Sequence, residues 1–276
     1  MINLKTQKEI EVMKEGGKIL AKILKELTKA VKPGITTQDL EKLARELVFK
    51  FRAKSAFLNY NGYPAALCTS LNDEIVHGVP SNRKLVKGDL LKLDTGVLCK
   101  GFYTDSAVTV LVGGVPLEVA SPRSSGPAPL ARARLLTGWP FDKQTLLKKK
   151  LVKITRESLE IGIKEARLGK TIGDIGSVIQ KYVEKHGFNI VRDLVGHGIG
   201  RELHEEPQVP NYGKSGEGIH LKPGMVIAIE PMVVTGDWKI KDGPDGFVFN
   251  TKDGGLAAHF EHTIAITEKG PLVLTR

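Results

Sequence analysis

Residues 92–110, KLDTGVLCKGFYTDSAVTV, hold two short β-rich runs separated by Lys100-Gly101. This separation is typical of a tight two-residue turn, so the stretch predicts an antiparallel hairpin. Asp94 and Asp105 lie eleven positions apart in it. Because side chains alternate with a period of two, pairing about that turn places both carboxylates on one face. Two carboxylates on a half-buried face repel unless a cation lies between them, although a pair of solvated surface aspartates is the simpler alternative.

Around this hairpin the chain alternates between helical and strand-like regions. Apolar residues recur at helical spacing before the hairpin and again after it, and turn signals divide the regions between. The order of helices, strands, helices and strands predicts an α+β fold with two similar halves. The expected helices run from Thr6 to Val31, from Thr36-Thr37 with Thr37 as N-cap, from about Leu146 to Ala166, and from near Ile172 to His186-Gly187; the strand regions are Phe57 to Val110 and Phe188 to the end.

One stretch differs from the rest in composition. Residues 115–144, roughly Val115 to Gln144, are rich in Pro, Ser, Ala, Gly and Arg and show little periodicity. We expect a surface insertion within a single catalytic domain that spans residues 1–276, and an insertion of this kind costs little stability.

Composition limits the classes of protein that this chain can represent. Its 276 residues are 41% hydrophobic, with no apolar run of the length (about 20 residues) that a membrane span needs. Cys68 and Cys99 form neither a disulfide framework nor a zinc-finger spacing, which favours a reducing, cytoplasmic setting. The net charge of +10 suggests an anionic neighbour such as the ribosome surface. Aromatic residues are few and no basic-aromatic module occurs, so sequence-specific nucleic-acid recognition is not expected.

Further residues that suit a metal occur along the chain. His197 and His204 lie in LVGHGIGRELHEEP, Glu230 and Glu261 each adjoin an apolar run, and His77 lies beside a turn. Each alone has an ordinary explanation, as a hydrogen-bonding histidine or a surface glutamate. Glycines 196, 198 and 200 suggest a phosphate loop, but Arg201 stands where a dinucleotide fingerprint requires glycine. Two Asp, two Glu and one His together suit two divalent ions bridged by carboxylates rather than a thiolate zinc site.

These residues occur in the order and sequence contexts of a known family. The phrases NGYP, HGVP, LDTG, TDSA, GHGIGRELHEEPQVPNYG, IEPM and FEHT match the pattern of the methionine aminopeptidases. The chain resembles a type I member over nearly its whole length except the insertion. The resemblance implies a pita-bread fold, in which two pseudo-symmetric halves share a central curved antiparallel sheet flanked by helices.

The resemblance also implies a role for each candidate residue. Asp94 and Asp105 would ligate two divalent metal ions (Co, Mn, Fe, Zn or Ni), His197 and Glu230 would complete one ion, and Glu261 would bridge both. A hydroxide that bridges the metals would attack the scissile carbonyl while Glu230 shuttles its proton. His204 would stabilise the oxyanion and His77 would position the substrate. The implied activity is removal of the N-terminal methionine from nascent polypeptides, preferentially before a small second residue.

The expected methionine pocket is apolar, as a flexible thioether requires. Where the family commonly has Cys, Phe and Trp, this chain has Phe57, Leu203 and Phe247, which leaves ordinary core packing as an alternative for these positions. The pocket residues are Phe57, Tyr60, Tyr63, Cys68, Leu203 and Phe247.

Three other interpretations compete with this one. Prolidases and Xaa-Pro aminopeptidases usually carry a separate amino-terminal domain, which this chain lacks. Type II methionine aminopeptidases need a helical insertion between His204 and Glu230, which lie only twenty-six positions apart. A catalytically silent binding protein would have lost metal ligands, and this chain retains all five. The enzyme is therefore favoured, and the resemblance further suggests a monomer.

Overall fold

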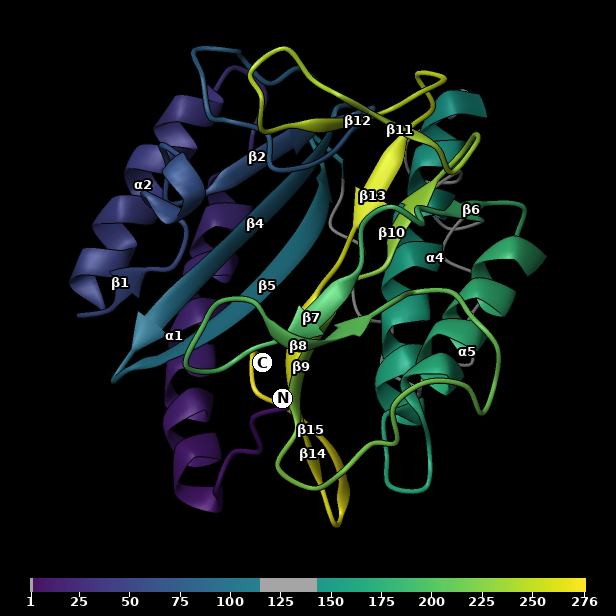
Figure 1. Ribbon diagram of the computed structural model, residues 1–276. Coiled ribbons are helices and arrows are strands. Elements are labelled where there is room, and N and C mark those ends of the chain that lie inside the picture. The colour runs from purple at the N-terminus through teal and green to yellow at the C-terminus, as the bar shows by residue number, and fades with distance from the viewer. Residues whose placement is uncertain (1, 115–142) are drawn as a thin grey trace, which may run out of the picture.

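Two pairs of helices enclose the strands of this protein. The structure, a computed structural model, describes residues 2–114 and 143–276. The first half contributes α1 (Gln7–Ala30) and α2 (Thr37–Lys50), and the second contributes α4 (Lys143–Glu165) and α5 (Ile172–Lys185). The pairs lie on opposite sides of the strands (Figure 1). The expected α+β order of two similar halves is thus confirmed.

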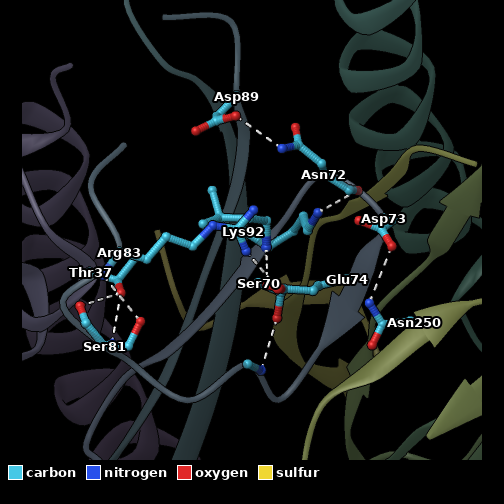
Figure 2. Close-up of polar contacts among 12 residues, drawn as sticks. Thr37, Ser70, Asn72, Asp73, Glu74, Ser81, Arg83, Asp89, Lys92 and Asn250 are labelled. Atoms are coloured by element: carbon cyan, nitrogen blue, oxygen red, sulfur yellow. Dashed lines mark hydrogen bonds and ion pairs between the residues drawn. The ribbon is translucent and has the colours of Figure 1, made fainter. Parts of the chain in front are cut away.

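Each of three helices begins with a capping box, which explains why the sequence starts a helix there. Thr6, Thr36 and Thr171 accept a hydrogen bond from the backbone N–H three residues on, and the acidic side chain at that position reaches back to the cap. The prediction of Thr37 as the N-cap of α2 is wrong by one residue, because Thr36 is the cap. The hydroxyl of Thr37 instead pairs with the backbone of Ser81 (Figure 2). Of these two threonines, only Thr36 has an acidic residue, Asp39, three positions downstream, where its side chain can bond the N–H of the cap.

The strands form small antiparallel sheets. Besides β4 (Leu90–Cys99) and β5 (Phe102–Leu111), the elements are β1 (Lys54–Ser55), η1 (Tyr60–Gly62), β2 (Cys68–Leu71), β3 (Glu74–Val76), β6 (Asn189–Ile190), β7 (Gly196–Gly198), β8 (Glu205–Val209), β9 (Val226–Ile229), β10 (Met232–Val234), β11 (Ile240–Asp242), β12 (Phe249–Thr251), β13 (Ala257–His259), β14 (His262–Thr267) and β15 (Gly270–Val273). One sheet has the order β1-β4-β2 with β5 on β4, and another has the order β15-β14-β9-β7-β8. Two further sheets have three strands each, in the orders β13-β10-β6 and β11-β12-β3.

The predicted hairpin is present with the predicted turn. Lys100 and Gly101 both have positive φ, 50° and 85°, as a type I′ turn requires. In the β4–β5 register Asp94 lies opposite Ala107 and Gly96 lies opposite Asp105. Asp94 and Asp105 therefore share one face of the hairpin, diagonal to each other, as the two-residue period predicts.

The two halves are joined next to these aspartates. Asp105 donates its backbone N–H to the hydroxyl of Thr263 over 2.9 Å, and that hydroxyl donates to the Asp105 carbonyl over 2.8 Å. The backbone of Ala107 exchanges hydrogen bonds with that of Glu261, at 3.4 and 3.0 Å. The seam between the halves thus runs through two of the predicted ligands.

A buried lysine adds a second link between the halves. Lys92 on β4 is 1% exposed, and its ammonium donates to the carbonyl of Asn72 at 3.0 Å (Figure 2) and to that of Ala257 at 3.2 Å. Ala257 begins β13 in the second half. Burial lowers the pKa of the Lys92 amine to about 7, because a charged amine is poorly solvated there.

The core is divided between the halves. One apolar cluster packs α1 and α2 against the hairpin, and another packs α4 and α5 against β9, β10 and β14. Across residues 2–114 and 143–276, no helix is both long and apolar enough to span a bilayer. Of the expected insertion, residues 115–142 lie outside the described part, whereas Lys143 and Gln144 already belong to α4, which begins three residues earlier than predicted.

The Lys92 amine gives a testable pH dependence of stability. Between pH 7 and about 10 the unfolded chain binds a proton that the folded chain releases, so the free energy of unfolding rises with pH from this group. In Lys92→Met this contribution is absent, and we expect the variant's stability relative to the parent to fall by about 2 kcal/mol from pH 7 to pH 9. Urea unfolding at both pH values measures it. Lys18→Met, on the exposed face of α1, is the control and should show no such change; equal pH slopes for parent and Lys92→Met would contradict the prediction.

Candidate metal centre and substrate pocket

Every residue that the sequence predicted for the site lines a single cavity of about 190 Å³. The cavity lies where the hairpin of the first half meets the sheet of the second. Its lining residues are Phe57, Tyr60, Asn61, Tyr63, Cys68, His77, Asp94, Asp105, His197, Leu203, His204, Glu230, Phe247 and Glu261. Residues that are up to 204 positions apart in sequence are thus brought to one cavity, which supports the prediction of a shared site.

The acidic residues form one cluster. Asp105, His197 and Glu261 each offer a ligand atom, and these atoms lie within 4.8 Å of one another. Glu230, between β9 and β10, places Oε1 3.7 Å from Nε2 of His197. Asp94 adjoins Asp105 on the hairpin face. The five predicted metal ligands therefore converge.

Burial makes the negative charge of this cluster costly. Burial, with the charges of Asp105 and Glu230 nearby, raises the pKa of Asp94 well above its ordinary value. Burial also raises the pKa of Asp105, to about 7, although the N–H of Ser106 opposes the rise. The pKa values of Glu230 and Glu261 are raised in the same way, first by burial and then by Asp105. Four carboxylates whose pKa values are all raised by burial form a site that a divalent cation can neutralise.

Unpaired oxygen atoms in the cluster fit the same ligand. Asp94 Oδ1 and Glu261 Oε1 are buried and have no hydrogen-bond partner in the described part of the chain. Buried polar atoms are rarely left in this state. First-row divalent ions such as Fe, Co, Ni and Zn take both carboxylate oxygens and a neutral imidazole, so the donor set present fits the metal ions that the sequence predicted.

Two histidines extend the cluster towards the open side of the cavity. The rings of His197 and His204 meet edge to face, with centroids 4.3 Å apart. Burial lowers the pKa of His197 to about 3 and lowers that of His204, so both rings are neutral at pH 7. The Tyr60 hydroxyl lies 2.9 Å from Nδ1 of His204. This contact fixes the ring and leaves Nε2 of His204 available to a substrate.

His77 lies in a strained backbone conformation at the cavity. Its φ is 62°, an uncommon value for a residue other than glycine. The neighbouring Gly78 donates its N–H to Ser70 over 3.0 Å and accepts from the hydroxyl of Tyr63 over 2.9 Å. These bonds hold the strained segment in place, and strain of this kind is typical of residues that act on a ligand.

The opposite wall of the cavity is apolar. Tyr63 and Phe247 contact each other edge to face at 5.4 Å, and Phe57, Cys68 and Leu203 are each no more than 8% exposed. Cys68 on β2 pairs directly with Asp94 on β4, so the apolar wall and the acidic cluster share neighbouring strands. Burial raises the pKa of the Cys68 thiol, which keeps it uncharged.

Sequence reasoning missed two residues of the site. Asn61 lines the cavity from the 3₁₀ turn η1. His259 is fully buried, with its Nε2 3.4 Å from Oε2 of Glu230. No local signal marks His259, because Phe260 and Glu261 lie outside β13 and β14 and its proximity to Glu230 arises from the pairing of β13 with β10.

Comparison with known proteins agrees with this geometry. The model of metallopeptidase family M24 matches residues 11–268. Methionine aminopeptidase from Clostridium acetobutylicum is 42% identical over 276 residues, covering 100% of this chain and 99% of the relative. Methionine aminopeptidase 1 from Bacillus subtilis is 41% identical over the full length of both. A crystal structure of methionine aminopeptidase from Thermotoga maritima superposes with a TM-score of 0.87 at 44% identity, covering 100% of both chains.

The fold and the site therefore define a metallopeptidase, and the chain belongs to family M24. Within that family it is one of the methionine aminopeptidases, as its full-length relatives show. The pita-bread fold that the sequence predicted is confirmed by the structural match. Prolidase from Pyrococcus furiosus shares this fold at 23% identity and a TM-score of 0.69, but the chain covers only 65% of it.

The raised pKa values predict that protons compete with metal ions. Affinity for Mn²⁺ should rise with pH between 6 and 8, because Asp105 and its neighbours must lose protons to bind a cation. The rise should reach about tenfold per pH unit for each proton released. Titration calorimetry of metal-free protein at pH 6, 7 and 8, in buffers of different ionisation enthalpy, measures both quantities. A pH-independent affinity without proton release would contradict the assigned cluster.

Proposed function

We propose that this methionine aminopeptidase removes the N-terminal methionine through a centre of two divalent metal ions and favours substrates whose second residue is small. The observation that carries the proposal is the convergence of four buried carboxylates and His197 on one wall of a cavity whose other wall is apolar. The first wall suits hydrolysis, and the second suits a methionine side chain.

Family M24 enzymes are metallopeptidases and so depend on a metal ion. The chain's own residues supply the ligands that a metal ion needs. We assign one ion to Asp94 and Asp105 and the other to His197 and Glu230, with Asp105 and Glu261 shared. When bound, the ions would activate water and polarise the scissile carbonyl. The oxygen-rich set accommodates Co, Mn, Fe, Zn or Ni, and affinity alone does not select among them.

The side chains around the centre have separate tasks. Glu230 has its Oε1 beside His197 and its pKa raised by burial, so it can take a proton from the attacking water and pass it to the leaving amine. His204, oriented by Tyr60, can donate from Nε2 to the developing oxyanion. His77, in its strained segment, can hold the substrate backbone.

The apolar wall would receive the methionine side chain. A flexible thioether packs well against the rings of Tyr63 and Phe247 and the thiol of Cys68. The proposed substrates are nascent polypeptides and free peptides that begin with methionine, as the resemblance to the methionine aminopeptidases implies. The preference for a small second residue is drawn from the resemblance to the family.

The cellular setting of the reaction is also part of the proposal. Cys68 and Cys99 are free thiols, which accords with the cytoplasm. The net charge of +10 favours proximity to the ribosome, where nascent chains emerge. We propose that a monomer suffices, since all five ligands come from one chain.

The first test measures release of free methionine from Met-Ala and Met-Leu peptides. Metal-stripped protein should be inactive, and added Mn²⁺ or Co²⁺ should restore cleavage of Met-Ala far more than of Met-Leu. Asp105→Asn should lower kcat by at least about a thousandfold, because it removes a shared ligand while preserving shape. Asp237→Asn, on an exposed loop away from the cavity, is the control. Full activity of metal-stripped protein or of Asp105→Asn would overturn the proposed centre.

The second test concerns the apolar wall. Phe247→Ala removes a ring that packs on Tyr63, and the lost apolar contact should reduce kcat/KM for Met-Ala by about 10–200-fold, equivalent to about 1–3 kcal/mol. Steady-state kinetics measure this, and Phe49→Ala, at a ring that is 86% exposed on α2, provides the comparison. If Phe247→Ala leaves kcat/KM unchanged, the ring does not contact the substrate.

A further inference from the structure

His259 is a buried histidine that has no assigned role in the reaction. It ends β13 and is 1% exposed. Neither of its ring nitrogens has a hydrogen-bond partner within the described part of the chain. An imidazole buried without partners costs free energy of folding, so its presence needs a reason beyond packing.

The nearest charged group explains where the ring is directed. Nε2 of His259 lies 3.4 Å from Oε2 of Glu230, and no other carboxylate in the described ranges lies within 4.0 Å of it. The second oxygen, Oε1, faces Nε2 of His197 at 3.7 Å. The Glu230 carboxylate is therefore held between two imidazoles, one for each oxygen.

The backbone on either side keeps His259 in this place. The hydroxyl of Thr109 accepts from the N–H of His259 at 2.9 Å and donates to its carbonyl at 2.7 Å. In the pairing of β10 with β13, His259 lies opposite Met232, and Met232 follows Glu230 by two residues. At the other end of β13, the Lys92 ammonium donates to the carbonyl of Ala257 at 3.2 Å. These bonds fix the backbone of His259, and with it the place from which the ring reaches Glu230.

We propose that His259 is a positioning residue, which donates its Nε2–H to Oε2 of Glu230 and so fixes the orientation of that carboxylate in the metal-loaded centre. Hydrogen bonds of this kind orient ligands and tune their affinity for metal. A hydrogen bond that is long before the centre is complete commonly shortens when it forms. The inference rests on the proposed metal centre.

Two other roles for His259 give different expectations. If it were itself a ligand, a ring nitrogen should converge with the other donor atoms. Among the described carboxylates, only that of Glu230 comes within 4.0 Å of a His259 ring nitrogen, so the ring does not reach the donor atoms of Asp94, Asp105 or Glu261. If it were only a core residue, an apolar side chain would serve better, because both nitrogens are unpaired.

The experiment compares His259→Leu with His259→Gln in the full chain. Leucine removes the donor, whereas glutamine retains an N–H of similar reach. For His259→Leu we expect Mn²⁺ affinity to fall about 10–100-fold and kcat on Met-Ala to fall with it, while KM changes less than about threefold. The thermal midpoint of the metal-free protein should not fall. His259→Gln should restore affinity and kcat to within about threefold of the parent. His220→Leu, at an exposed histidine, is the control.

Each outcome separates this inference from the proposed function. If the parent neither binds Mn²⁺ nor releases methionine, the proposed function fails. If the parent does both and His259→Leu binds Mn²⁺ equally well, only the positioning role fails. A loss that glutamine does not restore would make His259 a direct ligand, and a lowered midpoint of the metal-free protein without loss of affinity would make it structural; both results overturn the inference.

Discussion

Mutual repulsion among buried carboxylates is the constraint on which the rest of this structure depends. Asp94, Asp105, Glu230 and Glu261 line one cavity, where burial and then the charges of neighbouring carboxylates raise the pKa values of Asp94, Glu230 and Glu261. Only protons or cations can relieve that repulsion. The carboxylates come from both halves of the fold, so neither half alone carries the free-energy cost of burying all four. The seam between β5 and β14 holds Asp105 and Glu261 by backbone hydrogen bonds rather than through their carboxylates, which stay available.

The same arrangement explains why the cavity has two chemically different walls. Pairing of Cys68 with Asp94 places an apolar residue and a ligand on adjacent strands. Tyr60, in the 3₁₀ turn η1, contacts His204, and Tyr63, directly after η1, contacts Phe247. This turn and the residue after it therefore contribute to both walls of the cavity. A methionine side chain seated on the apolar side would carry its peptide bond towards the acidic cluster. Under the proposed function, recognition of methionine and hydrolysis are thus coupled through neighbouring backbone positions.

Much of this site could be predicted from sequence because its signals are local. The hairpin follows from Lys100-Gly101 and strand alternation, and the ligand positions follow from motifs with short, ordered contexts. The N-cap of α2 was misplaced by one residue because Thr36 and Thr37 have the same side chain, and only the reach of Asp39 separates them. His259 and Asn61 escaped prediction because their proximity to the site depends on pairing between distant strands and on a turn with positive φ at Asn61. Long-range pairing of this kind leaves little trace in a single sequence.

The glycines on either side of His197 show how packing can imitate a functional motif. Spacing alone suggested an anion-binding loop, an idea that Arg201 already disfavoured. A Cβ on Gly196 would lie 2.3 Å from the carbonyl oxygen of Ala228, and one on Gly198 would lie 2.2 Å from that of Glu206. Both positions thus permit β7 to approach β8 and β9 closely. Any larger residue would push β7 outward and move the His197 imidazole away from Glu230. The glycines are therefore needed for the metal centre through backbone packing, since they set the distance at which the imidazole meets the carboxylates.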